Sequence, residues 1–150
     1  GDGDHDIIYS YGGRSFSIWG SDGTLIFDSG NAFENIISSS SPEQFNANGG
    51  KTEFDDRSDD KGPEPEALSL GKIEGRTYAF IGMERNNAIF AYDITLPSDP
   101  HMVGYIMPSD MHNSPEGIEF ISAKDSPTGK PLLAVAFEMS GTVAIYEVRK

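Results

Sequence analysis

The sequence predicts an all-β fold of about two and a half four-stranded antiparallel units, arranged as in a segment of a β-propeller. Short runs of β-branched and aromatic residues alternate with glycine, proline and asparagine turns along most of the 150 residues. One four-strand unit is repeated within the chain, and the second strands of both copies are mostly apolar. A strand that is apolar on both faces lies between two layers, which predicts stacked sheets.

The internal repeat lies in the second half of the chain. Residues 78–94 align without gaps with residues 132–148, at an offset of 54 (132 − 78 = 54). Upstream, Pro65-Glu66 aligns with Pro115-Glu116 at an offset of 50 (116 − 66 = 50). Periods of roughly 40–50 residues are typical of propeller blades.

Each copy divides into strands at its turn residues. In the first copy we expect strands over 67–73, 77–83, 88–94 and 102–106, and in the second over 117–122, 131–138 and 142–148. Three further strands are expected over 6–11, 16–20 and 24–28, with a hairpin at Asp22-Gly23. Because they lie in strand positions, Trp19, Tyr92 and Tyr146 are expected in the core between blades.

The chain is therefore expected to be a single segment, residues 1–150. It divides into a partial blade (1–30), a long acidic and polar loop (31–62) with a helical turn near 32–37, a full blade (63–108) and a partial blade (109–150). These units do not close a propeller, which needs about 4–8 blades. The remaining blades are expected from a longer parent protein or from other copies of this chain.

Composition excludes several classes of function. The 24 acidic and 11 basic residues give a formal net charge of −13, which disfavours nucleic acid as a partner. The absence of cysteine excludes disulfides, zinc fingers and a thiol nucleophile. No apolar run is long enough for a transmembrane segment, and no signal peptide is visible.

Several stretches together carry a family resemblance. They are GGRSFSIW (12–19), LIFDSG (25–30), DDRSDDKGPEPEAL (55–68), AFIGMER (79–85), SPEGIEFISAKDSPTGKPLL (114–133) and AFEMSGTVAIYEV (136–148). In this order the chain resembles the C-terminal part of the choice-of-anchor I family. That family includes mesenchyme-specific cell-surface glycoproteins linked to biomineralisation, and bacterial exported proteins often labelled alkaline phosphatase. The resemblance implies a propeller-like fold in an extracellular, periplasmic or cell-surface protein.

An acidic run supplies the candidate metal ligands. The run from 55 to 66 holds six carboxylates, interrupted by Arg57 and Lys61. Crowded carboxylates repel one another unless a cation compensates, and hard oxygen ligands suit Ca²⁺ or Mg²⁺. The repeat matches Glu66 with Glu116, and Glu84 and Glu138 end the second strands. We therefore expect a Ca²⁺ site, formed by Asp59, Asp60, Glu64, Glu66, Glu116 and Glu138. The alternative is a solvated acidic loop whose strand-end glutamates cap backbone amides.

Two functions of different class remain open. The first is a non-catalytic calcium-binding and interaction module with a mineral, polymer or protein ligand. The second is a metal-dependent phosphoesterase in which Arg57, Lys61 and Arg85 bind phosphate oxygens. We favour the first, because no Gly-x-Ser-x-Gly elbow or other nucleophile stands out. A segment with no function of its own is a third possibility.

Overall fold

The structure, a computed structural model, describes residues 12–49 and 53–149, which form three antiparallel sheets and one α-helix. The strand expected over 6–11 lies outside the described residues. The strands of the first two sheets are β1 (Ser17–Trp19) with β2 (Leu25–Asp28), and β3 (Pro65–Ile73), β4 (Arg76–Met83), β5 (Ala88–Asp93) and β6 (His101–Ile106). The third sheet holds β7 (Pro115–Ile121), β8 (Leu132–Phe137) and β9 (Thr142–Glu147). The mostly β fold is therefore confirmed.

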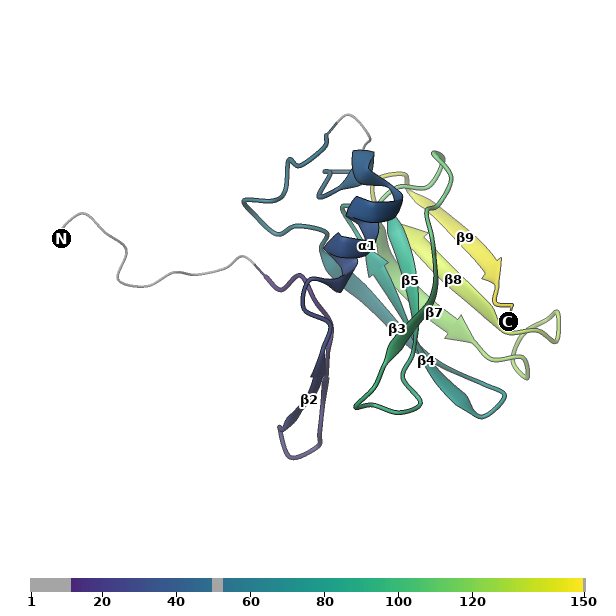
Figure 1. Ribbon diagram of the computed structural model, residues 1–150. Helices are drawn as coiled ribbons and strands as arrows, with labels where there is room; N and C mark the ends of the chain where they lie inside the picture. The colour runs from purple at the N-terminus through teal and green to yellow at the C-terminus, as the bar shows by residue number, and fades with distance from the viewer. Residues whose placement is uncertain (1–11, 50–52, 150) are drawn as a thin grey trace.

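Each sheet is a meander in which neighbours in sequence are neighbours in space. The β3–β4 turn shows why: Glu74 and Gly75 have φ values of 48° and 84°, the left-handed pair that a two-residue hairpin requires. The four-stranded and three-stranded sheets correspond to the two copies of the repeat. They stack face to face, as Figure 1 shows, and the three sheets do not close into a ring.

One core lies between the four-stranded and three-stranded sheets. The rings of Phe80 and Phe120 stack with centroids 5.6 Å apart, and the backbone N–H of Phe120 donates to Ser69 Oγ at 3.0 Å. Gly71 allows this approach, because a Cβ at that position would lie 2.6 Å from the Phe120 ring. The contact fixes the spacing of the two repeats.

A second core lies on the opposite face of the four-stranded sheet. It is covered by α1 (Ala32–Ser40), which is followed by a short 3-10 helix, η1 (Pro42–Gln44). Phe33 of α1 is fully buried, and its ring meets those of Phe90 and Tyr92. The expected helical turn is thus a full helix that covers a sheet face. No helix among the described residues is long and apolar enough to cross a membrane.

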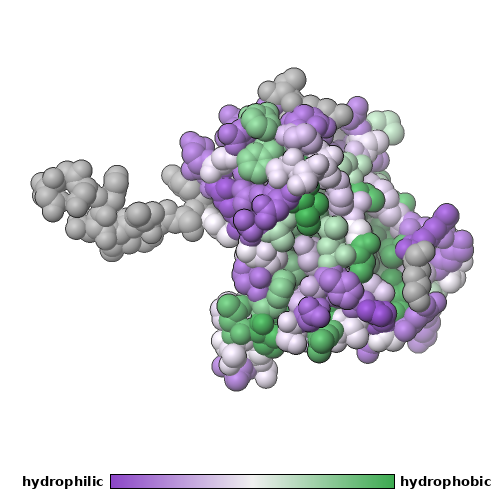
Figure 2. Space-filling view, viewed as in Figure 1, coloured by the Kyte–Doolittle hydropathy of each residue, from purple (hydrophilic) through white to green (hydrophobic). Residues whose placement is uncertain are grey.

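The placement of Trp19 differs from expectation. Its side chain is 60% exposed, because within residues 12–49 and 53–149 the β1–β2 hairpin forms a sheet of its own and extends from the body of the molecule (Figure 1). Leu25 and Ile26 on the same hairpin are also exposed, and Figure 2 shows hydrophobic surface there. Tyr92 is buried as expected, and Tyr146 is half-buried against the inter-sheet core.

Candidate functional site

The site is built on a backbone motif that occurs once in each copy of the repeat. At Pro65-Glu66 and at Pro115-Glu116 the strand register shifts, as in a β-bulge. The residue before each proline, Glu64 or Ser114, has a left-handed φ of 51° or 64°. A bulge of this kind redirects side chains at the start of a strand.

A matching hydrogen bond closes the motif in both copies. The N–H of Glu84 donates to the Glu64 carbonyl at 2.9 Å, and the N–H of Glu138 donates to the Ser114 carbonyl at 2.8 Å. Proline lacks an N–H, so it fits the first position of a strand, where no ladder bond is lost. The fold therefore brings the residue before the proline next to the end of the second strand.

In the first copy this motif gathers three carboxylates. Oxygens of Glu64, Glu66 and Glu84 all lie within 4.8 Å of one another. Glu64 and Glu84 are buried, with 5% of each side chain exposed, whereas Glu66 is exposed. We call these three residues the glutamate cluster.

Three basic residues surround the glutamate cluster. Arg85 bridges it, with Nε 2.7 Å from Glu64 and a terminal nitrogen 2.9 Å from Glu84. Lys61 Nζ lies 2.6 Å from Glu64, and Arg57 lies 3.3 Å from the same carboxylate. Three cations therefore face three carboxylates, and Glu64 takes most of this compensation.

The two buried carboxyls differ in their protonation. The pKa of Glu84 is raised from its ordinary 4.5 to about 7, chiefly by burial and also by the hydrogen bond with Glu66, while Arg85 opposes the shift. Burial also raises the pKa of Glu64, but the contacts with Lys61 and Arg85 outweigh burial and hold this pKa below its usual range. Glu64 is thus a fixed anion, while Glu84 accepts a proton near neutral pH.

The same geometry suits a hard divalent cation. Ca²⁺ binds carboxylate oxygens at about 2.3–2.6 Å, so oxygens up to about 5 Å apart can share one ion. Glu66 is open to solvent, and Glu84 has one basic partner, Arg85, whereas Glu64 has three. A cation bound here would replace the proton on Glu84, so the donor set fits Ca²⁺.

The structure separates the predicted ligands into groups. Glu64 and Glu66 lie together, and Asp60 pairs with Arg57 at 3.2 Å beside them. Asp59 is exposed on the preceding turn, and Glu116 and Glu138 are exposed on the second copy. None of these three lies in the carboxylate group found among residues 12–49 and 53–149.

Glu84 is the member of the glutamate cluster that sequence reasoning placed at a strand end without including it in the predicted metal site. Its signal was the alignment with Glu138, since both end second strands. The bases predicted to bind phosphate have other contacts. Arg57, Lys61 and Arg85 are all paired with Glu64.

The second copy lacks the chemistry of the first. Ser114 takes the place of Glu64, and Met139 takes the place of Arg85 at the offset of 54 (139 − 85 = 54). Ser114 is fully buried, and Met139 is 59% exposed. The backbone motif is shared, but the charged site is confined to the first copy.

These features define a class: an antiparallel β protein of stacked sheet repeats that carries a partly buried glutamate cluster at the start of one strand. Comparisons with known sequences assign the chain to a family. Residues 1–97 match the choice-of-anchor I domain, and this chain belongs to that family. The resemblance inferred from the sequence is confirmed.

Two curated relatives extend the match over nearly the whole chain. Gigasin-3a of Magallana gigas is 35% identical over 173 aligned residues, covering 99% of this chain and 60% of that protein. The mesenchyme-specific cell surface glycoprotein of Strongylocentrotus purpuratus is 28% identical over 155 residues, covering 94% of this chain and 18% of that protein. This chain therefore spans less than two thirds of either relative. No solved structure matches it.

Proposed function

We propose that this chain is part of an extracellular or cell-surface protein and acts there as a non-catalytic, calcium-binding interaction module. The observation that carries the proposal is the glutamate cluster, whose three carboxylates lie within 4.8 Å of one another. The similarity to a protein named as a cell surface glycoprotein supports the location. The surplus of 13 negative charges attracts cations to this surface.

Calcium titration of the metal-free chain by calorimetry tests the proposal. Glu66→Gln removes an exposed ligand and should abolish binding, or weaken it at least about tenfold. Glu116→Gln is the matched comparison, because Glu116 occupies the same bulge in the second copy and is also exposed. It should bind Ca²⁺ as the wild type does. Binding that survives Glu66→Gln, or is lost equally in Glu116→Gln, would contradict the site as placed.

The pairing of the basic residues favours this module over a phosphoesterase. A phosphate-binding arginine needs free N–H groups, yet the side chains of Arg57, Lys61 and Arg85 all contact Glu64. Incubation with p-nitrophenyl phosphate and Ca²⁺ or Mg²⁺ should give no turnover above that of buffer. Turnover that disappears in Glu66→Gln would instead support the metal-dependent phosphatase.

We also propose that the two large sheets are blades of a propeller. The support comes from the packing of aligned residues. In the first copy Phe80 and Ile89 pack in the core shared with the second sheet. The residues aligned with them at the offset of 54 are Ala134 and Val143 (80 + 54 = 134; 89 + 54 = 143), and Val143 is 66% exposed.

The residues on the opposite faces of the two sheets are related by the same offset. Ile81 packs toward α1, and its aligned partner Val135 packs toward the first sheet. Each copy thus has one face for the preceding layer and one for the following layer. On the second copy the following face, with Val143 and Ile145, is exposed. A further sheet of the same repeat, from a longer parent chain or another copy, is the partner that fits it.

A further inference from the structure

A groove of about 630 Å³ lies at the outer edge of the three-stranded sheet. One wall is formed by Tyr146 and Val148 at the end of β9, and the other by Ala91 of β5 and Val103 of β6. Tyr146, Val148 and Ala91 also pack against the core between the two large sheets. The groove is therefore the open continuation of that core, and Val103 on its wall is 52% exposed.

The internal repeat shows what lies beside the corresponding strand of the first copy. β5 aligns with β9 at the offset of 54 (88 + 54 = 142), and β6 pairs with β5. The ring of Tyr105 on β6 stacks on that of Phe90 with centroids 5.1 Å apart. Phe90 aligns with Ala144 (90 + 54 = 144), and among the described residues β9 pairs with β8 alone. A strand beside β9 would place side chains next to Ala144 and Tyr146, along the groove.

The outer edge of β9 presents backbone groups for such a strand, and Figure 1 shows β9 at the edge of its sheet. The N–H of Val148 donates to the carbonyl of Pro131, before β8, at 2.9 Å. Alternate residues of an antiparallel strand bond to the same neighbour, so the backbone groups of Val143, Ile145 and Glu147 point the other way. No strand pairs with this side within residues 12–49 and 53–149.

This edge lacks the features that protect natural edge strands from pairing. Charged residues, prolines and bulges are the usual protection. The first five residues of β9 include no charge or proline, and its register with β8 is regular. In contrast, β6, an edge strand of the four-stranded sheet, has a register shift against β5. Val143 and Ile145 are 66% and 57% exposed. An unprotected edge beside an apolar groove indicates that another strand covers both.

The position of β6 limits the occupant to a single strand. Two copies paired through β9 would be related by a twofold axis normal to the sheet. Each copy would then bring its own β6 into the space that β5 and β6 of the other copy occupy. Both curated relatives are longer than this chain, so a longer parent protein has further segments to supply a strand.

We propose that the groove and the β9 edge accept one extended segment of the parent protein, apolar at alternate positions, as the fourth strand of the sheet. The segment adds main-chain hydrogen bonds to β9 and places alternate side chains in the groove, the mode of recognition known as β-augmentation. The inference rests on the repeat of the two sheets. It is independent of calcium binding and of whether the sheets belong to a closed ring.

The register of β6 identifies the N–H groups that such a strand uses. The N–H of Ile94 donates to the carbonyl of Thr77 on β4 at 2.9 Å, so by the same alternation the backbone of Ala91 points toward β6. Gly104 is the register partner of Ala91. The N–H of Gly104 therefore points toward β5, and that of Tyr105 points away from it.

Fluorescence anisotropy of a labelled peptide with the sequence of residues 99–108, which contains β6, tests the proposal on the full chain in EGTA. The peptide should bind. N-methylation at Gly104 of the peptide should weaken binding at least about tenfold, because it blocks an N–H that pairs with β9. N-methylation at Tyr105 is the matched control and should leave binding unchanged, because that N–H points away from β9.

A substitution in the groove provides the second arm. Val103→Glu in the protein places a charge on the groove wall and should weaken binding of the unmodified peptide at least about tenfold. Leu96→Glu is the control, because Leu96 is 59% exposed and lies outside the groove. Both side chains are exposed, so both variants should keep the fold. Glu66→Gln should bind the peptide as the wild type does, which separates this test from that of the calcium site.

Three results would overturn the inference. The first is that the wild-type chain does not bind the peptide. The second is equal binding of the two N-methylated peptides, which would mean that apolar contacts alone hold the peptide and no strand is added. The third is a dimer in sedimentation velocity that Val103→Glu dissociates, which would make a second copy of the chain the occupant.

Discussion

Replacing Glu84 by glutamine should change how the stability of the protein depends on pH. The folded state holds the pKa of Glu84 at about 7 against an ordinary 4.5, chiefly because the carboxyl is buried. A raised folded pKa means that the folded state binds the proton more tightly than the unfolded state does. The stability from this group is therefore complete below about pH 4.5 and is lost as pH rises through about 7.

The magnitude follows from the shift. The difference of about 2.5 pH units (7 − 4.5) corresponds to about 3 kcal/mol at 1.36 kcal/mol per unit. This is an upper value, because movement of Glu66 away from Glu84 relieves part of the cost of the buried charge. Glutamine has the same shape and no charge, so Glu84→Gln should remove most of this dependence. Relative to wild type, the variant should gain roughly 1–3 kcal/mol between about pH 5 and pH 8.

Urea unfolding in EGTA at several pH values measures this difference. Glu138→Gln is the matched control, because Glu138 aligns with Glu84 but is exposed. Its stability curve should run parallel to that of the wild type. Parallel curves for Glu84→Gln as well would refute the reasoning. A variant that loses stability relative to wild type as pH rises would show that the ion pair with Arg85 outweighs burial.

Two further predictions concern the sheets. Gly71→Ala should destabilise the fold by about 1–3 kcal/mol in urea unfolding, because its Cβ would meet the Phe120 ring at 2.6 Å, whereas Gly104→Ala, with no atom within 4 Å, should be close to neutral. Equal effects of the two substitutions would contradict the close packing of the repeats. Val143→Glu should reduce concentration-dependent self-association in light scattering without lowering the free energy of unfolding by more than about 0.5 kcal/mol, since Val143 is 66% exposed. A large loss of stability would mean that this face is already covered.

The strands were predictable because the repeat constrains them twice. Expected and observed strand ends in the two copies agree within about two residues, and the Pro-Glu step that aligned at 65 and 115 is a register shift in both. Trp19 was misplaced because an aromatic residue in a strand pattern indicates burial only when another layer covers that strand. The β1–β2 hairpin lacks such a layer among the described residues.

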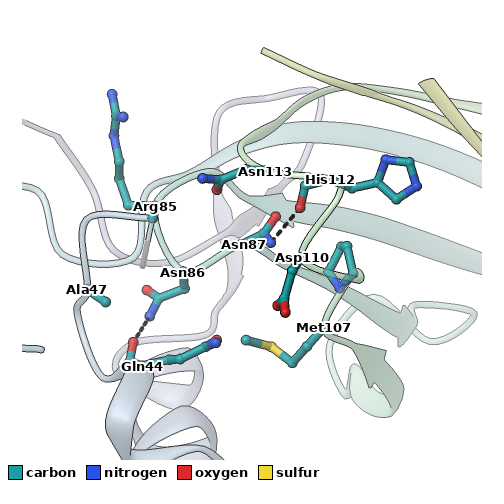
Figure 3. A pocket seen from close by; sticks show the side chains of 11 residues that line it. Gln44, Ala47, Arg85, Asn86, Asn87, Met107, Asp110, His112 and Asn113 are labelled. Carbon is teal, nitrogen blue, oxygen red and sulfur yellow. Dashed lines mark hydrogen bonds between the residues drawn. The ribbon is translucent and has the colours of Figure 1, made fainter. Parts of the chain in front are cut away.

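The residue types of the site were predictable from the sequence, but the particular residues that form it were less so. The acidic run and the proline-glutamate step pointed to Glu64 and Glu66. The inclusion of Glu84 depends on a backbone hydrogen bond across the bulge, which composition does not reveal. A pocket between η1, the β4–β5 turn and the β6–β7 connection (Figure 3) was beyond sequence reasoning for a related reason. Gln44, Asn86 and Asn113 lie on three separate connections, and only the packed sheets bring those connections together.

The two copies show how one backbone motif can carry charge or omit it. Both copies have the left-handed residue, the proline and the bulge, so the motif does not depend on the buried carboxylates. In the second copy a small buried serine replaces Glu64, and an exposed methionine replaces Arg85. Burying Glu64 with its basic partners carries a desolvation cost that the second copy avoids. The fold does not require this cost, so the first copy is where we propose that a cation binds.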